Sequence, residues 1–122
     1  MIKICWKEIE PICRWLYVSR MIHVIATIEI VPGKRDLYLA EFCKLAPVVR
    51  AEAGCLEYFT AVDFPTAIQR QAPVRNDVVV ILERWSSVEA LQIHLAAPHM
   101  ATYRERVKNY VSGSRLDILR GT

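Results

Sequence analysis

The fold is decided by the stretch DVVVILERWSSVEALQIHLAAPH, residues 77–99. It opens with Asp77–Trp85, where five aliphatic residues in a row are typical of a strand buried on both faces. The S-S-V-E sequence that follows predicts a capping box, in which Ser86 and Glu89 start a helix that runs through Leu95. A strand that leads directly into a capped helix favours an α+β domain.

Two helical segments are predicted after this strand. The apolar stripe of the first has His94 one step to its side, and its members recur at helical spacing: Val88, Leu91 and Leu95. Pro98 suits the first turn of the second segment, because a backbone N–H is not needed there. This segment is expected to run to about Val111, with three apolar residues on one face: Met100, Tyr103 and Val107. Ser112-Gly113 is expected to end it before a final strand, Ser114–Leu119.

Upstream, the chain predicts a strand, a helix and a second strand. Met21–Val31 alternates and places one apolar set on a single face: Ile22, Val24, Ala26, Ile28 and Ile30. Lys34–Ala53 predicts an amphipathic helix with apolar residues three and four apart: Tyr38, Phe42, Leu45 and Val49. Pro47 is expected to kink this helix or replace its last turn, and Gly54 to close it with a positive φ. Cys55–Asp63 predicts the second strand.

The order strand, helix, strand, strand, helix, strand predicts a ferredoxin-like α+β fold, β-α-β-β-α-β, over residues 21–122. Its four-stranded antiparallel sheet would have helices on one face only. The other face would then expose apolar side chains, so we expect a homodimer whose sheets face each other. The connection Phe64–Asn76 is long for a hairpin, and such loops are often functional or mobile.

Composition and charge exclude several classes of protein. The 122 residues fit one domain, and 53% hydrophobic with 24% charged residues indicates a globular chain. The net charge is only +3 and the basic residues are scattered among acids, so nucleic acid is not an expected partner. No apolar run reaches the roughly 20 residues of a membrane span, so no membrane is expected either.

Residues 1–20, MIKICWKEIEPICRWLYVSR, do not fit the domain pattern. They lack the apolar core and cleavage site of a secretory signal. We expect an N-terminal extension that results from a start codon assigned too early, or else an additional helix from Lys7 to Tyr17. The chain's four cysteines form no CxxC motif and predict free, buried or half-buried thiols in a reducing cytoplasm: Cys5, Cys13, Cys43 and Cys55.

The sequence predicts neither a cofactor nor a metal. None of the four glycines stands in a GxGxxG or P-loop motif. His94 and His99 are five residues apart with Pro98 between them, so they lack the i, i+4 geometry of a helical zinc pair. The two imidazoles remain the natural proton carriers at neutral pH. Trp85 and two tyrosines, Tyr58 and Tyr103, are candidates for a cavity, although each of these residues also suits a purely structural role.

Four motifs give the chain a resemblance to a known family. They are V-P-G-K at Val31–Lys34, E-A-G-C-L-E-Y at Glu52–Tyr58, E-R-W-S-S-V-E-A-L at Glu83–Leu91 and H-L-A-A-P-H at His94–His99. From Met21 onward the sequence resembles the antibiotic biosynthesis monooxygenases, which include quinol monooxygenases. The resemblance implies a dimeric α/β barrel with a pocket between sheet and helices, and oxidation of electron-rich phenols by O₂ without metal or flavin.

The resemblance also implies roles for particular residues. His94 would be the catalytic base or hydrogen-bond partner, Trp85 a wall that stacks on a flat ring, and three further residues would contact the substrate: Tyr58, Tyr103 and His99. The first strand lacks the Asn of haem-degrading relatives, so haem degradation is disfavoured. The long connection would cover the pocket or reach across the dimer.

The sequence therefore predicts a cytoplasmic, cofactor-independent monooxygenase that oxidises a small hydroquinol or polyphenolic substrate with O₂. Two alternatives use the same scaffold. One is a non-catalytic dimeric binding module for a small aromatic metabolite. The other is an isomerase or decarboxylating enzyme, because a fold does not determine its chemistry.

Overall fold

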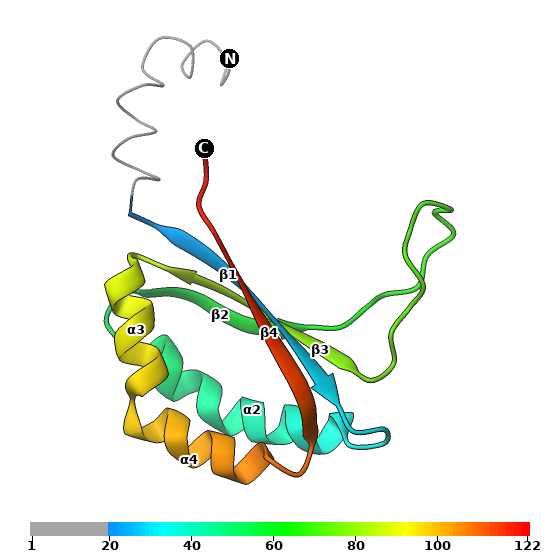
Figure 1. Cartoon of the computed structure of the whole chain (residues 1–122), viewed down its shortest axis with the longest axis horizontal. Helices are drawn as coiled ribbons and strands as arrows, with labels where there is room; N and C mark the ends of the chain where they lie inside the picture. Colours follow the sequence, from blue (N-terminus) through cyan, green and yellow to red (C-terminus); the bar gives the residue numbers. More distant parts are fainter. Residues whose placement is uncertain (1–19) are drawn as a thin grey trace, which may run out of the picture.

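The computed structural model describes residues 20–122, which form one four-stranded antiparallel sheet with three helices on one face (Figure 1). The extension expected for residues 1–20 lies, but for its last residue, outside the described part. The elements are β1 (Ile22–Ile30), α2 (Arg35–Arg50), β2 (Cys55–Ala61), β3 (Val78–Trp85), α3 (Val88–Ala96), α4 (Pro98–Val107) and β4 (Val111–Leu119).

The strand order is β2-β3-β1-β4, which confirms the ferredoxin-like prediction. Between β3 and β4 lie two separate helices, α3 and α4, as predicted, and together they take the place of the second helix in the β-α-β-β-α-β order. Within residues 20–122, no helix is both long and apolar enough to cross a membrane.

The sheet has two faces of different character. The alternating set of β1 from Ile22 to Ile30 is buried under the helices, as predicted. In β3 only alternate residues are buried, such as Val79 and Ile81, while Val78 and Val80 are half-buried on the other face. The expectation that this strand is buried on both faces is therefore not met within a single chain, because nothing in the described chain covers the outer face.

The helix α2 buries the stripe predicted for it and continues through Pro47 to Arg50. Gly54 does not close this helix, whose cap is Ala51. Instead, Gly54 shapes the turn before β2 with a φ of +84°, and its carbonyl accepts a hydrogen bond of 2.8 Å from the backbone N–H of Ser86. This bond joins the start of β2 to the start of α3.

The capping box predicted at Ser86 and Glu89 is wrong by one residue. Ser87 caps α3, and its hydroxyl accepts from the backbone N–H of Ala90 at 3.1 Å. The N–H of Ser86 is already bonded to Gly54, so the chain remains extended for one residue longer than predicted. The buried residues of α3 are Leu91 and His94, whereas Val88 of the predicted stripe is exposed.

The helix α4 starts at Pro98 as predicted and buries the expected face, but it ends at Val107 rather than near Val111. Ser112-Gly113 lies inside β4, where Gly113 pairs with Glu29 of β1. Pairing with β1 satisfies these backbone groups and ends the helix early. Of the cysteines within residues 20–122, Cys55 is half-buried and free as expected, whereas Cys43 is free but exposed.

Replacement of Gly54 by alanine is expected to destabilise the protein for two reasons. An alanine Cβ there would lie 2.6 Å from the Cβ of Ala90 and 2.7 Å from the Oγ of Ser86, at a positive φ. Gly33→Ala is the matched control, because Gly33 has a φ of +82° but no atom within 4 Å of the added Cβ. We expect Gly33→Ala to lose about 1 kcal/mol in urea unfolding and Gly54→Ala about 2–4 kcal/mol. Equal losses would show that crowding at Gly54 is unimportant.

Candidate functional site

A cavity of about 440 Å³ lies between the sheet and the helices. Its floor is apolar and comes from alternate residues of the central strands: Ala26, Ile28 and Ile81. Its walls include an imidazole, a carboxyl group and phenols, supplied by His94, Glu83, Tyr58, Tyr103 and Tyr38. The cavity is large enough for one small aromatic molecule and is mostly apolar, as ligand sites usually are.

His94 and His99 meet at a single carboxylate, that of Glu52. The Nδ1 atom of His94 lies 3.0 Å and 3.2 Å from the two carboxylate oxygens, and Nε2 of His99 lies 2.6 Å from one of them. His94 comes from α3 and His99 from α4, while Glu52 stands in the turn after α2. His94 lines the cavity, but Glu52 and His99 do not.

His94 is buried and sits in an aromatic environment. Its ring lies 4.7 Å from that of Trp85 and 5.5 Å from that of Tyr58, between ring centres. Burial lowers the pKa of His94, although the hydrogen bond and charge of Glu52 act in the opposite direction. This lowered pKa favours the neutral imidazole, which is able to accept a proton.

Trp85 lies behind the cavity rather than in its wall. Its side chain is fully buried and is absent from the lining of the cavity. The indole Nε1–H donates to Oε1 of Glu83 at 2.8 Å, and the ring packs on His94. This placement does not fit the stacking of Trp85 on a substrate ring. Trp85 instead holds two cavity residues, Glu83 and His94, in position.

Glu83 is a buried carboxyl group in the wall of the cavity. It belongs to β3 and faces inward opposite Tyr58 of β2. Burial raises the pKa of Glu83 to about 7, with the hydrogen bond from Trp85 opposing and the charge of Glu52 reinforcing the shift. A carboxyl group that titrates near neutral pH can exchange protons in the cavity, and such groups often mark functional sites.

Three tyrosines complete the aromatic wall, and Tyr58 and Tyr103 are the two expected from the sequence. Burial raises the pKa of Tyr38 to about 12, and it raises the pKa values of Tyr58 and Tyr103 as well. All three phenols therefore stay protonated. The hydroxyl of Tyr103 is buried and makes no well-formed hydrogen bond among residues 20–122, although the phenol of Tyr38 lies close to it. A bound molecule could accept its hydrogen bond.

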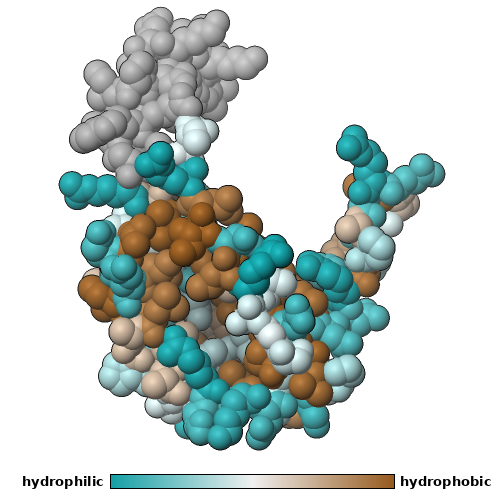
Figure 2. Space-filling model, viewed as in Figure 1, coloured by the Kyte–Doolittle hydropathy of each residue, from teal (hydrophilic) through white to brown (hydrophobic). Residues whose placement is uncertain are grey.

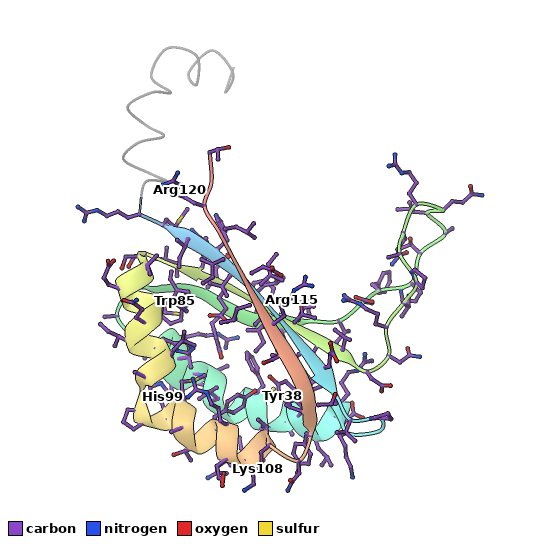
Figure 3. The ribbon with its side chains drawn as sticks, viewed as in Figure 1. Tyr38, Trp85, His99, Lys108, Arg115 and Arg120 are labelled. Carbon is purple, nitrogen blue, oxygen red and sulfur yellow. The ribbon has the colours of Figure 1, made fainter. Side chains whose placement is uncertain are left out.

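Cationic side chains line the cavity on the side of α4 and β4. They are Arg104, Lys108 and Arg115. Lys108 and Arg115 have exposed acidic partners, Glu105 and Asp117, whereas Arg104 donates to the carbonyl of Leu95 at 2.8 Å. Figure 3 labels Lys108, at the end of α4, and Arg115, on β4.

Glu52, His94 and His99 also offer three potential metal ligands, whose donor atoms all lie within 4.8 Å of one another. The spacing of the two histidines does not reveal this set, because Glu52 is 42 residues upstream of His94. Two ligands of one tetrahedral zinc ion lie roughly 3.3 Å apart, given bonds of about 2.0–2.1 Å. The 2.6 Å between His99 and Glu52 is instead a hydrogen-bond distance.

Glu52 and Glu83 are site residues that were not predicted from the sequence. For Glu83 the sequence does contain a signal. Glu83 lies an even number of residues after Val79 and Ile81 in β3, and both of these residues face the core. Two-residue alternation therefore places its carboxyl group inside. No comparable signal exists for Glu52, because its place depends on the turn at Gly54 and on how α3 packs.

Fold and cavity together define a class: ferredoxin-like α+β domains with an aromatic-lined pocket between sheet and helices. The family model described as antibiotic biosynthesis monooxygenase matches residues 21–106. The chain therefore belongs to the antibiotic biosynthesis monooxygenase family, as its motifs indicated, and this membership supports a monooxygenase.

Similar proteins agree with this assignment. The protein named "Probable quinol monooxygenase YgiN" of Escherichia coli (strain K12) is 38% identical over 101 residues, which cover 81% of this chain and 96% of the relative. A crystal structure from Caulobacter crescentus CB15 superimposes with a TM-score of 0.72 at 25% identity, covering 88% of this chain and 94% of the other. PA3566 from Pseudomonas aeruginosa shares the fold, with a TM-score of 0.69 at 24% identity over 87% and 98% of the two chains.

Glu83 is expected to make stability depend on pH. Its pKa is about 7 in the folded protein and about 4.5 in the unfolded chain, so the folded state binds more protons between these values. Stability should therefore fall as pH rises from 4.5 through 7, by about 3 kcal/mol from this group alone. Glu83→Gln should remove this part of the fall in urea unfolding measured from pH 4 to pH 8.

The exposed Glu57→Gln serves as the control for Glu83→Gln, because its side chain lies on the other face of the sheet. It should leave the pH dependence unchanged. Identical pH profiles for Glu83→Gln and the wild type would contradict an elevated pKa at Glu83.

Proposed function

We propose that this protein is a cofactor-independent monooxygenase that oxidises a small hydroquinol or polyphenolic substrate with O₂. The observation that carries the proposal is a neutral, buried His94 in the wall of an apolar cavity among three phenols. The name of the Escherichia coli relative, "Probable quinol monooxygenase YgiN", supports the same substrate class.

The chemistry needs a substrate that is acidic enough to lose a proton and reducing enough to give an electron to oxygen. His94 takes the phenolic proton, and the resulting anion transfers one electron to O₂. The radical pair then combines to form a carbon–oxygen bond. Loss of water from the hydroperoxide leaves a hydroxyquinone, so that one hydroquinol and one O₂ give one hydroxyquinone and one water.

The cavity would assist these steps by positioning and desolvation. The apolar floor removes water from the anion and makes it a stronger reductant. The unpartnered hydroxyl of Tyr103 can donate a hydrogen bond to a substrate oxygen. Glu83 stands ready to accept or return a second proton, because its pKa lies near neutrality.

Oxygen uptake by the chelator-treated protein with a panel of reduced quinones tests the proposal. Uptake should exceed spontaneous autoxidation, and His94→Ala should reduce the enzymatic part by roughly 100-fold or more, as loss of a general base does. His23→Ala is a matched control, because His23 lies on β1 away from the cavity. It should keep the activity of the wild type.

Other outcomes of this experiment would favour the alternatives. Saturable binding of the reduced quinones with no uptake across the panel would indicate a binding module. Conversion of substrate under nitrogen at the rate seen in air would indicate an isomerase or a decarboxylating enzyme. Either result would overturn the monooxygenase proposal.

We also propose that the protein is a homodimer formed through the outer face of the sheet. This face carries half-buried apolar residues, such as Ile25 and Leu82, and the exposed ring of Phe59. The arm formed by residues 62–77 extends away from the body (Figure 1) and carries Phe64 and Ile68, which are 77% and 68% exposed. Figure 2 shows further apolar side chains gathered on the visible surface of the body. A second copy would cover these groups.

Ile68→Asp is expected to weaken the dimer, because it puts a charge in the apolar part of the arm. Ile93→Asp is its matched control, since Ile93 is equally apolar and 71% exposed but lies on α3, on the other side of the sheet. Light scattering should give twice the 14.0 kDa mass of one chain for the wild type and for Ile93→Asp. A wild-type mass equal to one chain would refute the dimer.

A further inference from the structure

The carboxylate of Glu52 is shared by two imidazoles from two helices. One oxygen, Oε2, lies 3.0 Å from Nδ1 of His94 and 2.6 Å from Nε2 of His99. His94 is buried, Glu52 is nearly so, and His99 is partly exposed. The three residues thus form a chain of contacts from the cavity wall to the surface.

The direction of the hydrogen bonds follows from the chemistry of the groups. An ionised carboxylate can only accept hydrogen bonds, so the ring nitrogens facing it must carry protons. In the neutral imidazole only one nitrogen carries a proton, so Nε2 of His94 keeps its lone pair. Glu52 is not among the residues that line the cavity, whereas His94 is, so the Nδ1 edge of the ring faces away from the cavity.

We propose that Glu52 is a positioning residue that fixes His94 in its Nδ1–H tautomer, with Nε2 left as the acceptor for a substrate proton. The consequence for catalysis rests on the proposed function, but the tautomer itself does not. Glu52 also stabilises the imidazolium that forms once the proton has moved, because its negative charge lies next to the ring.

His99 has a different part in this arrangement. It donates a second hydrogen bond to the same carboxylate and so holds Glu52 in place from α4. Its charge, when protonated, opposes that of His94 and lowers the pKa of His94, after the larger effect of burial. His99 is therefore a second support for the carboxylate rather than a residue of the cavity wall.

The groups that face His94 come from four parts of the fold, and they decide how it titrates. They are Glu52 in the turn after α2, Tyr58 on β2, Trp85 on β3, and His99 and Arg104 on α4. Glu83, which accepts a hydrogen bond from Trp85, lines the same cavity as His94. Glu52 is the only one among these that both contacts the ring nitrogen and favours the imidazolium.

Nitrogen NMR of the imidazoles tests the tautomer directly, because protonated and unprotonated ring nitrogens have distinct ¹⁵N shifts. The wild type should show His94 with the proton on Nδ1 at pH values where it is neutral. Glu52→Gln should shift the population toward the Nε2–H tautomer, because the amide N–H₂ can donate to Nδ1. Glu57→Gln, whose side chain is exposed, should leave the tautomer as in the wild type.

Kinetics add a second measurement. Glu52→Gln should lower kcat for oxygen uptake by about 100-fold with little change in KM, because the base is lost while the cavity remains. The acidic limb of the pH profile should move with the pKa of His94. His99→Ala should keep the tautomer and raise the pKa of His94, because a competing cation is removed. This variant keeps the test available if Glu52→Gln fails to fold.

Three results would overturn the proposal. The first is a wild-type His94 that carries its proton on Nε2. The second is a Glu52→Gln variant with unchanged tautomer and pH profile. The third is stoichiometric Zn²⁺ binding by calorimetry that is lost in both Glu52→Gln and His99→Ala, which would make the three residues a metal site. If no substrate gives oxygen uptake, the proposed function fails, and the NMR result still decides the role of Glu52.

Discussion

The antiparallel pairing of β1 with β3 is the constraint on which the rest of the structure depends. The register sets Ala26 opposite Ile81 and Val24 opposite Glu83, so the inward residues of both strands form one continuous layer. Because the aliphatic residues of this layer are buried in the core, the two-residue alternation of β3 also places Glu83 and Trp85 on the inward face. The carboxyl group is thus buried by the register of its strand, and its raised pKa follows from that burial.

The turn at Gly54 determines the second part of the site, in which Glu52 contacts His94. It lets the chain leave α2 and enter β2 within a few residues, in close contact with Ser86 and Ala90 at the start of α3. Because α3 is held there, His94 comes to lie beside Glu52. A backbone conformation that only glycine adopts easily therefore determines where two ionisable side chains meet.

The sequence predicted the sheet and the helical faces well, because both rest on periodicity. The inward set of β1 and the buried residues of α2 and α4 follow alternation and helical spacing directly. Ser87 replaced Ser86 as a cap because a long-range bond to Gly54 competed with the local motif. His94, Tyr58 and Tyr103 line the cavity together, whereas Trp85 supports it from behind and His99 lies outside. Contacts such as that of Glu52 with His94 could not be derived, since they depend on packing between distant segments.

The unpartnered hydroxyl of Tyr103 affects the stability of the empty protein and of the ligand-bound protein in different ways. A buried hydroxyl without a partner costs about 1–3 kcal/mol in the empty protein. A phenylalanine at this position would avoid that cost and would make the empty protein more stable. A tyrosine regains the loss only when a ligand accepts its hydrogen bond.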